Sequence, residues 1–147
     1  MSRRISFRGK IASGAQESIP LQSINGMIGY QIKKFQLMLP NPGTSAAESV
    51  VKIYKTEQDT IDSAVDFSDN RLLAAAFLAH DNAPQYSYVE IVVFDNEKFN
   101  QDVYVTHNNS HSGAIDCNYY IEMEQMKLDL NEQTVATLKD IRNSGSQ

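Results

Sequence analysis

Short segments in which apolar and polar side chains alternate with a period of two recur along this chain, separated by polar turns. Residues 4–12 show the pattern on opposite faces: Ile5, Phe7 and Ile11 on one, Arg4, Arg8 and Lys10 on the other. A period of two is typical of a half-buried β-strand, and an edge position would let the long basic side chains reach water. The N-terminal segment is therefore predicted to be an edge strand.

Comparable segments predict further strands at 19–22, 27–39, 49–55, 64–67, 86–94, 102–106 and 117–128. Residues 70–80 are ambiguous because their leucines and alanines favour a helix. They are few and lie between strands, so we interpret them as a strand. Eight or so strands joined by polar turns predict a mostly β fold, a two-sheet antiparallel β-sandwich of which the jelly roll is one version.

Two of these strands support more detailed predictions. In 27–39 the apolar side chains change parity at Lys33–Lys34, which predicts a β-bulge or bend there. In 86–94 the run Val89–Phe94 is apolar on both faces, which predicts a strand buried on both sides.

After the last strand the apolar period changes from two to three. Val135, Leu138 and Ile141 predict a short helix over 131–142 with a narrow apolar stripe. Asp129 or Asn131 could cap its first turn.

The length of 147 residues fits one domain, with a basic N-terminal strand or arm at 1–12 and the helix at 131–142. The net charge is −5, and the first ten residues carry four positive charges, so the remainder sums to −9. An acidic body argues against direct binding of nucleic acid. No apolar run approaches the roughly 18 residues of a membrane span, and residues 1–10 lack the apolar part of a secretory signal. We therefore expect neither nucleic acid nor a membrane as a partner.

Two groups contain residue types that can bind metals. His107 and His111 are four apart and precede Cys117, the single cysteine, but they lie in a polar segment where a solvated loop is the favoured interpretation. An acidic and amide group offers oxygen ligands of the kind calcium accepts: Asp95, Asn96, Glu97, Asn100 and Asp102. Such residues also dominate ordinary turns, and the spacing of an EF-hand is missing. We expect no metal and no cofactor.

Catalytic patterns are missing as well. There is no Gly-x-Ser-x-Gly motif, and Cys117 has no basic neighbour in the sequence to lower its pKa. Glu122 and Glu124 share a strand face, but acid–base catalysis requires a cleft with unequal environments. We expect a protein that is not an enzyme, with no catalytic residues. A group of tyrosines could instead form a carbohydrate-binding platform or belong to the core or an interface: Tyr86, Tyr88, Tyr119 and Tyr120.

Three segments of the C-terminal half, with a weaker fourth upstream, resemble known proteins: VVFDNEKFNQDVYVTH (92–107), CNYYIEMEQMKL (117–128), ATLKDIRNS (136–144) and VDFSDNRLLAAA (65–76). They resemble small proteins encoded beside structural genes in marine bacteriophages, which we take to be capsid-decoration or other minor virion proteins. The resemblance implies a non-enzymatic virion structural protein, made in the host cytoplasm, that forms homo-oligomers and binds the major capsid protein or other virion proteins. A head-to-tail or tail-associated virion protein and a carbohydrate-binding β-sandwich remain the alternatives.

The protein contacts are expected at the two ends of the chain. The candidate contact residues are Arg3, Arg4, Arg8, Lys10, Val135, Leu138 and Ile141.

Overall fold

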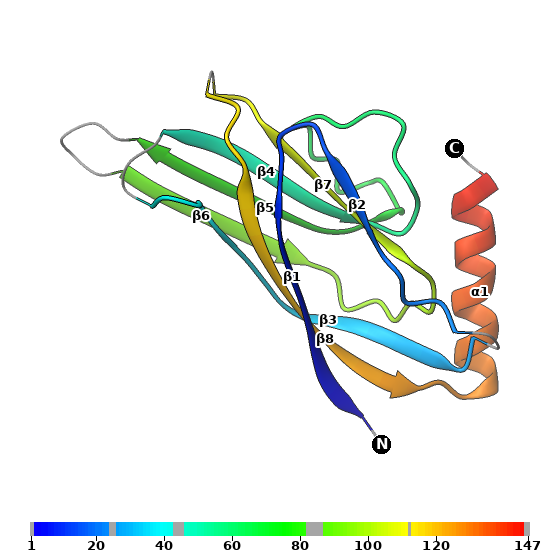
Figure 1. The fold of residues 1–147 in the computed structure, drawn as a ribbon. Coiled ribbons are helices and arrows are strands. Elements are labelled where there is room, and N and C mark those ends of the chain that lie inside the picture. The colour runs from blue at the N-terminus through cyan, green and yellow to red at the C-terminus, as the bar shows by residue number, and fades with distance from the viewer. Residues whose placement is uncertain (1, 24–25, 43–45, 82–86, 112, 146–147) are drawn as a thin grey trace.

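The computed structural model describes residues 2–23, 26–42, 46–81, 87–111 and 113–145. Two antiparallel sheets pack against each other, with one helix at the C-terminal end (Figure 1). The smaller sheet has the strand order β1 (Arg3–Ile11), β8 (Cys117–Lys127), β3 (Ile28–Met38). The larger sheet has the order β2 (Gln16–Ile19), β7 (Val103–Asn109), β4 (Ala47–Tyr54), β5 (Leu72–Asp81), β6 (Ser87–Phe94). The predicted two-sheet antiparallel sandwich is confirmed, but this strand order does not establish a jelly roll.

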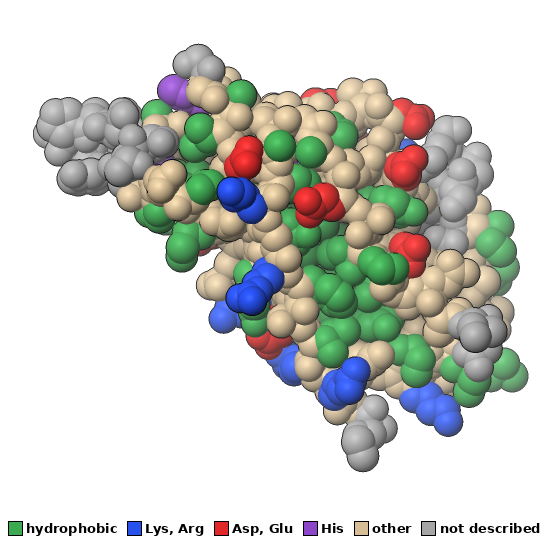
Figure 2. Space-filling view, in the orientation of Figure 1, with side chains coloured by type: hydrophobic (Ala, Val, Ile, Leu, Met, Phe, Trp, Pro, Cys, Tyr) green, Lys and Arg blue, Asp and Glu red, His purple; other side chains and the backbone are tan. Residues whose placement is uncertain are grey.

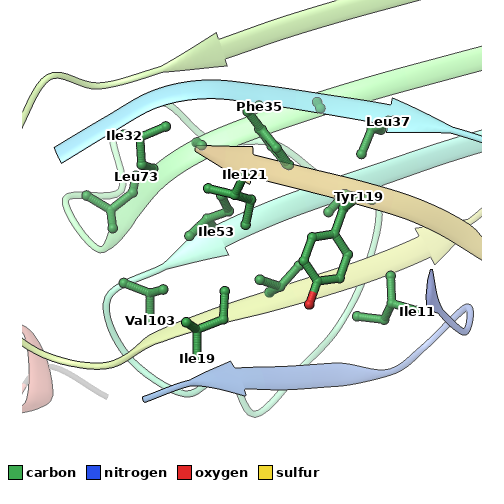
Figure 3. Packing of buried hydrophobic residues seen from close by; sticks show 14 of the residues in the cluster. Ile11, Ile19, Ile32, Phe35, Leu37, Ile53, Leu73, Val103, Tyr119 and Ile121 are labelled. Carbon is green, nitrogen blue, oxygen red and sulfur yellow. The ribbon is translucent and has the colours of Figure 1, made fainter. Parts of the chain in front are cut away.

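The core lies between the sheets, and the period of two decides which side chains enter it. In β8, Tyr119, Ile121 and Met123 are buried, while the residues between them are only half-buried on the outer face. Side chains of the larger sheet, such as Val103 and Ile53, meet them from the other side (Figure 3). The alternation read from the sequence is therefore the alternation between core and surface.

The predicted irregularity in β3 is confirmed. The pairing of β3 with β8 shifts between Ile32 and Lys34, so Lys33 is the extra residue of a bulge. Because of this shift, Ile32 and Phe35 both face the core although they differ in parity. The interpretation of 70–80 as a strand is confirmed too, since β5 covers Leu72–Asp81.

The predicted strand at 64–67 is wrong. Residues 55–71 contain no strand and form a long connection between β4 and β5. Lys52 explains part of this path, because its ammonium group is buried on the outer side of β4 and needs acceptors. The connection supplies them through the Asp62 carboxylate, 3.2 Å from the Lys52 Nζ, and the backbone carbonyl of Ala64.

The prediction that the strand at 86–94 is buried on both faces is also wrong. That strand exists as β6, but it forms the end of the larger sheet, and within the described part of the chain it pairs only with β5. Five of its apolar side chains are between 39% and 55% exposed: Tyr88, Val89, Ile91, Val93 and Phe94. An apolar strand has the same sequence pattern whether the rest of its chain buries it or leaves it exposed to solvent. The pattern alone therefore led to the wrong prediction.

The C-terminal helix α1 spans Leu130–Gly145, slightly longer than predicted. Asp129 caps it, as expected, in a reciprocal arrangement with Glu132. The backbone N–H of Glu132 donates to Asp129 Oδ1 at 2.8 Å, and the N–H of Asp129 donates to Glu132 Oε1 at 3.2 Å. Within the described residues, no helix has the length and apolar character needed to cross a membrane.

Candidate functional site

His107 and His111 do not form a shared site. His107 lies on β7 and is fully buried, whereas His111 is exposed in the segment that follows. The Nδ1–H of His107 donates to the Ile11 carbonyl at 3.0 Å, which leaves Nε2 to accept from the Ser49 hydroxyl at 3.0 Å. Burial lowers the pKa of His107, so the neutral ring is favoured.

Cys117 lies beside this buried group, because it pairs with Ile11 across β1 and β8, and its thiol donates to the Asn118 carbonyl at 3.5 Å. Burial raises the pKa of Cys117 to about 12, so this thiol stays protonated and unreactive at neutral pH. Histidine, serine and cysteine together suggest a nucleophile with its base. All three side chains are nevertheless closed off from solvent, so a substrate could not reach them. The group acts as a hydrogen-bond network in the core.

Three of the five proposed calcium ligands are engaged in holding the fold: Glu97, Asn100 and Asp102. Asp102 Oδ1 accepts backbone N–H groups of Leu21 and Gln22 at 2.8 and 2.9 Å. Glu97 pairs with Lys55 at 2.7 Å. Asn100 donates its amide to the Gly26 carbonyl at 3.2 Å. No group of three or more metal-ligating side chains occurs among the residues that the structure describes.

Glu122 and Glu124 lie on the outer face of β8, where neither is enclosed. Arg4 is 2.8 Å from Glu122, and Tyr120 donates its hydroxyl to the same carboxylate at 3.1 Å. The hydrogen bond from Arg4, with that from Tyr120, lowers the pKa of Glu122. This ionised, half-buried carboxylate is held by arginine as a contact between β1 and β8 on the surface of the sheet.

The basic N-terminal residues lie on β1, which is an edge strand of the smaller sheet, as predicted. Figure 2 shows lysine and arginine side chains along the path of this strand. Arg3 and Arg4 already bind Gln125 and Glu122 of the same chain. Arg8 and Lys10 instead line a groove.

This groove, of about 610 Å³, crosses the smaller sheet on the side nearest β6. Two rows of side chains line it, and each row runs across β1, β8 and β3. The rows are Arg8, Tyr120 and Gln36, and Lys10, Asn118 and Met38. Tyr88 and Glu90 of β6 complete it. Glu90 is held there because its carboxylate accepts the N–H of Leu37 at 3.0 Å.

The predicted tyrosine platform is divided by the fold. Tyr88 and Tyr120 line the groove, with the ammonium of Lys34 5.8 Å from the centre of the Tyr120 ring. Tyr119 also borders the groove, but its side chain is buried and its hydroxyl donates to Glu17 at 2.8 Å. Tyr86 lies outside the described residues.

The apolar stripe of α1 faces away from the sandwich. Four of its side chains are between 52% and 76% exposed: Leu130, Val135, Leu138 and Ile141. The side toward the sheets is mainly polar, with Ala136 as its buried apolar residue. Thr137 accepts from the Asn100 amide, and Lys98 pairs with Glu132.

Sequence reasoning missed two features of this surface. The groove depends on the strand order, which brings residues 8–10, 36–38, 88–90 and 118–120 together. The open edge of β6 depends on its place at the end of the sheet. No model of a known protein family matches this chain, and no curated protein is a detectable relative of it.

Proposed function

We propose that this chain is a non-enzymatic structural protein that acts by docking onto other proteins, in the form that the sequence resemblance implies: a decoration or minor protein of a phage capsid. The observation that carries the docking role is the outward apolar stripe of α1. A surface helix normally turns its apolar side toward the core. Here four large side chains are left at least half exposed, and such a patch is typical of a protein interface.

The polar contacts that hold α1 in place support the same proposal. The ion pair between Lys98 and Glu132, the Asn100 contact to Thr137 and the 3.7 Å pair between Lys139 and Glu97 fix the helix against the sandwich. A helix held by polar contacts on one side can present a rigid apolar stripe on the other. The virion role itself rests on the resemblance of residues 65–76 and 92–144.

The test is recruitment to purified phage particles. We expect the chain to co-purify with intact capsids and to raise their resistance to heat, with hundreds of copies counted by quantitative mass spectrometry. The variant L138E/I141E should lose at least about 90% of its occupancy, since two carboxylates in a buried apolar contact are strongly unfavourable.

The matched control is T60E/N70E, which adds the same charge to exposed polar positions of the connection between β4 and β5, outside the apolar stripe, and should bind normally. Full occupancy of L138E/I141E, or capsids that neither contain the chain nor gain stability from it, would contradict the proposal. A few copies at one vertex would instead indicate a head-to-tail or tail-associated protein.

The groove favours carbohydrate as a second candidate ligand. Its volume is within the range of small-ligand sites, and it combines three tyrosines with amide, carboxylate and basic groups. On a glycan array, binding should fall roughly tenfold in Y120A, since the ring covers the apolar face of a sugar. The exposed Phe67→Ala change, outside the groove, is the control. No binding by the unmodified protein to any glycan would remove this candidate.

A further inference from the structure

We infer that β6 pairs with β6 of a second copy of this chain, so that two five-stranded sheets join into one across a two-fold axis at Ile91. The inference goes beyond the proposed virion role and does not depend on it. It begins from the fact that a strand at a sheet end presents unpaired backbone N–H and C=O groups, which proteins usually protect.

The other three sheet edges carry such protection. Four basic residues line β1: Arg3, Arg4, Arg8 and Lys10. The strand β2 has only four residues and is followed by Pro20. At β3, Glu90 occupies the N–H of Leu37, and the backbone of Tyr30 bonds that of Phe99.

Edge β6 has none of these features. It has eight residues, pairs with β5 without a bulge and contains neither proline nor lysine (Figure 1). Its one charged residue, Glu90, is already bonded to Leu37. Among the described residues, no strand pairs with its outer edge. An open, regular and apolar edge of this kind is suited to pairing with another strand.

The register identifies which backbone groups are open. The N–H of Asp95 donates to the Leu73 carbonyl of β5 at 2.9 Å. Backbone direction alternates along a strand, so the odd-numbered residues of β6 face β5 and the even-numbered ones face outward. The residues whose backbone N–H and C=O groups point away from β5 are therefore Tyr88, Glu90, Val92 and Phe94.

A second copy of β6, antiparallel and related by a two-fold axis at Ile91, would pair the open backbone groups of all four residues. Tyr88 then pairs with Phe94 of the second copy, and Glu90 pairs with Val92. Like charges directly opposite each other would weaken the pairing, and this register brings none together. A shift by two residues in either direction would leave outward groups unpaired, so the centred register is the best one.

The outer face of the sheet favours the same arrangement. Ile91 meets Ile91 of the second copy, and Val89 meets Val93, so six aliphatic side chains form one stripe. Beside it lies a hollow of about 280 Å³, lined by Phe67, Val93 and Phe94 among others. Phe67 is 70% exposed and adds apolar surface at its margin.

The area sets the expected strength. Half-exposed aliphatic and aromatic side chains have roughly 60 Å² each left to bury, and with the strand backbone the two copies would bury on the order of 1,000 Å². This is the lower limit for a specific interface. We therefore expect a reversible dimer with a Kd on the order of 10 μM.

Sedimentation equilibrium of the full chain, from about 1 to about 500 μM, tests this. The unmodified protein should dimerise, and I91K should remain monomeric because it places two ammonium groups at the axis. V65K makes the same change at an exposed apolar residue of the connection between β4 and β5 and should dimerise normally. Circular dichroism must show that both variants are folded.

A second measurement uses the two-fold axis. Directly opposite residues of a pair without hydrogen bonds have Cα atoms about 4.5 Å apart, within the range of a disulfide. Under mild oxidation I91C should form a covalent dimer, whereas F94C, whose opposite residue is Tyr88, should not. The native Cys117 is buried and adds no background.

A protein that stays monomeric at 500 μM, or an I91K variant that dimerises as well as the unmodified chain, would overturn the inference. A third variant, L138K, tests α1: loss of the dimer in L138K but not in I91K would place the contact at α1 and would also overturn the inference. Because these measurements use the isolated protein, their failure leaves the capsid test unaffected, and failure of the capsid test leaves them unaffected.

Discussion

Replacing Ile121 with alanine is expected to lower the free energy of unfolding by about 3 kcal/mol. Ile121 is fully buried in the central strand of the smaller sheet, directly between Phe7 of β1 and Phe35 of β3. Both neighbouring strands are held in place by hydrogen bonds to β8, so they cannot close the space that the lost methyl groups leave. Urea unfolding followed by circular dichroism measures the change.

Met38→Ala is the matched control, because Met38 lies on β3 in the same sheet but is exposed. Its effect should stay within about 0.5 kcal/mol. A loss below about 1 kcal/mol in I121A would mean that the two sheets pack loosely at this point.

Acidification is expected to destabilise the protein through His107. Burial lowers the folded-state pKa of this residue below its ordinary value, so the unfolded chain binds a proton as the pH falls through about 6.5, before the folded chain does. Stability is therefore fully present above that pH and decreases below it, by up to about 1.4 kcal/mol per pH unit until the folded pKa is reached. Urea unfolding at pH 7.5 and at several lower pH values measures this slope.

The variant H107Q should be less stable at pH 7.5, because the network with Ser49 and Ile11 is disturbed, but its stability should depend less on pH. The exposed His111→Gln change should leave the slope as in the unmodified protein. Equal slopes for the unmodified protein and H107Q would assign the acid sensitivity to other groups.

The parts of this fold that depend on local pattern could be predicted from the sequence. Alternation placed β1 at an edge, the parity change located the bulge at Lys33, and the spacing of Val135, Leu138 and Ile141 indicated a helix. Each of these features is specified by neighbouring residues, whose period is that of the element they form.

Features that depend on strand order could not be predicted. Ser49 and His107 are 58 residues apart in sequence and meet because β4 and β7 are neighbours. The exposure of β6 has the same origin, because nothing within residues 87–94 shows that this strand lies at the end of its sheet. Long-range pairing decides these features, and no local pattern encodes it.

The burial of Cys117 provides this protein with an internal reporter of its own opening. It is the single thiol of the chain, and a thiol-specific reagent reacts with it only after β8 has separated from its neighbours. The modification rate in native buffer thus measures how often the sandwich opens, without any added label. The free chain, the proposed dimer and the proposed capsid-bound form can be compared on that one scale.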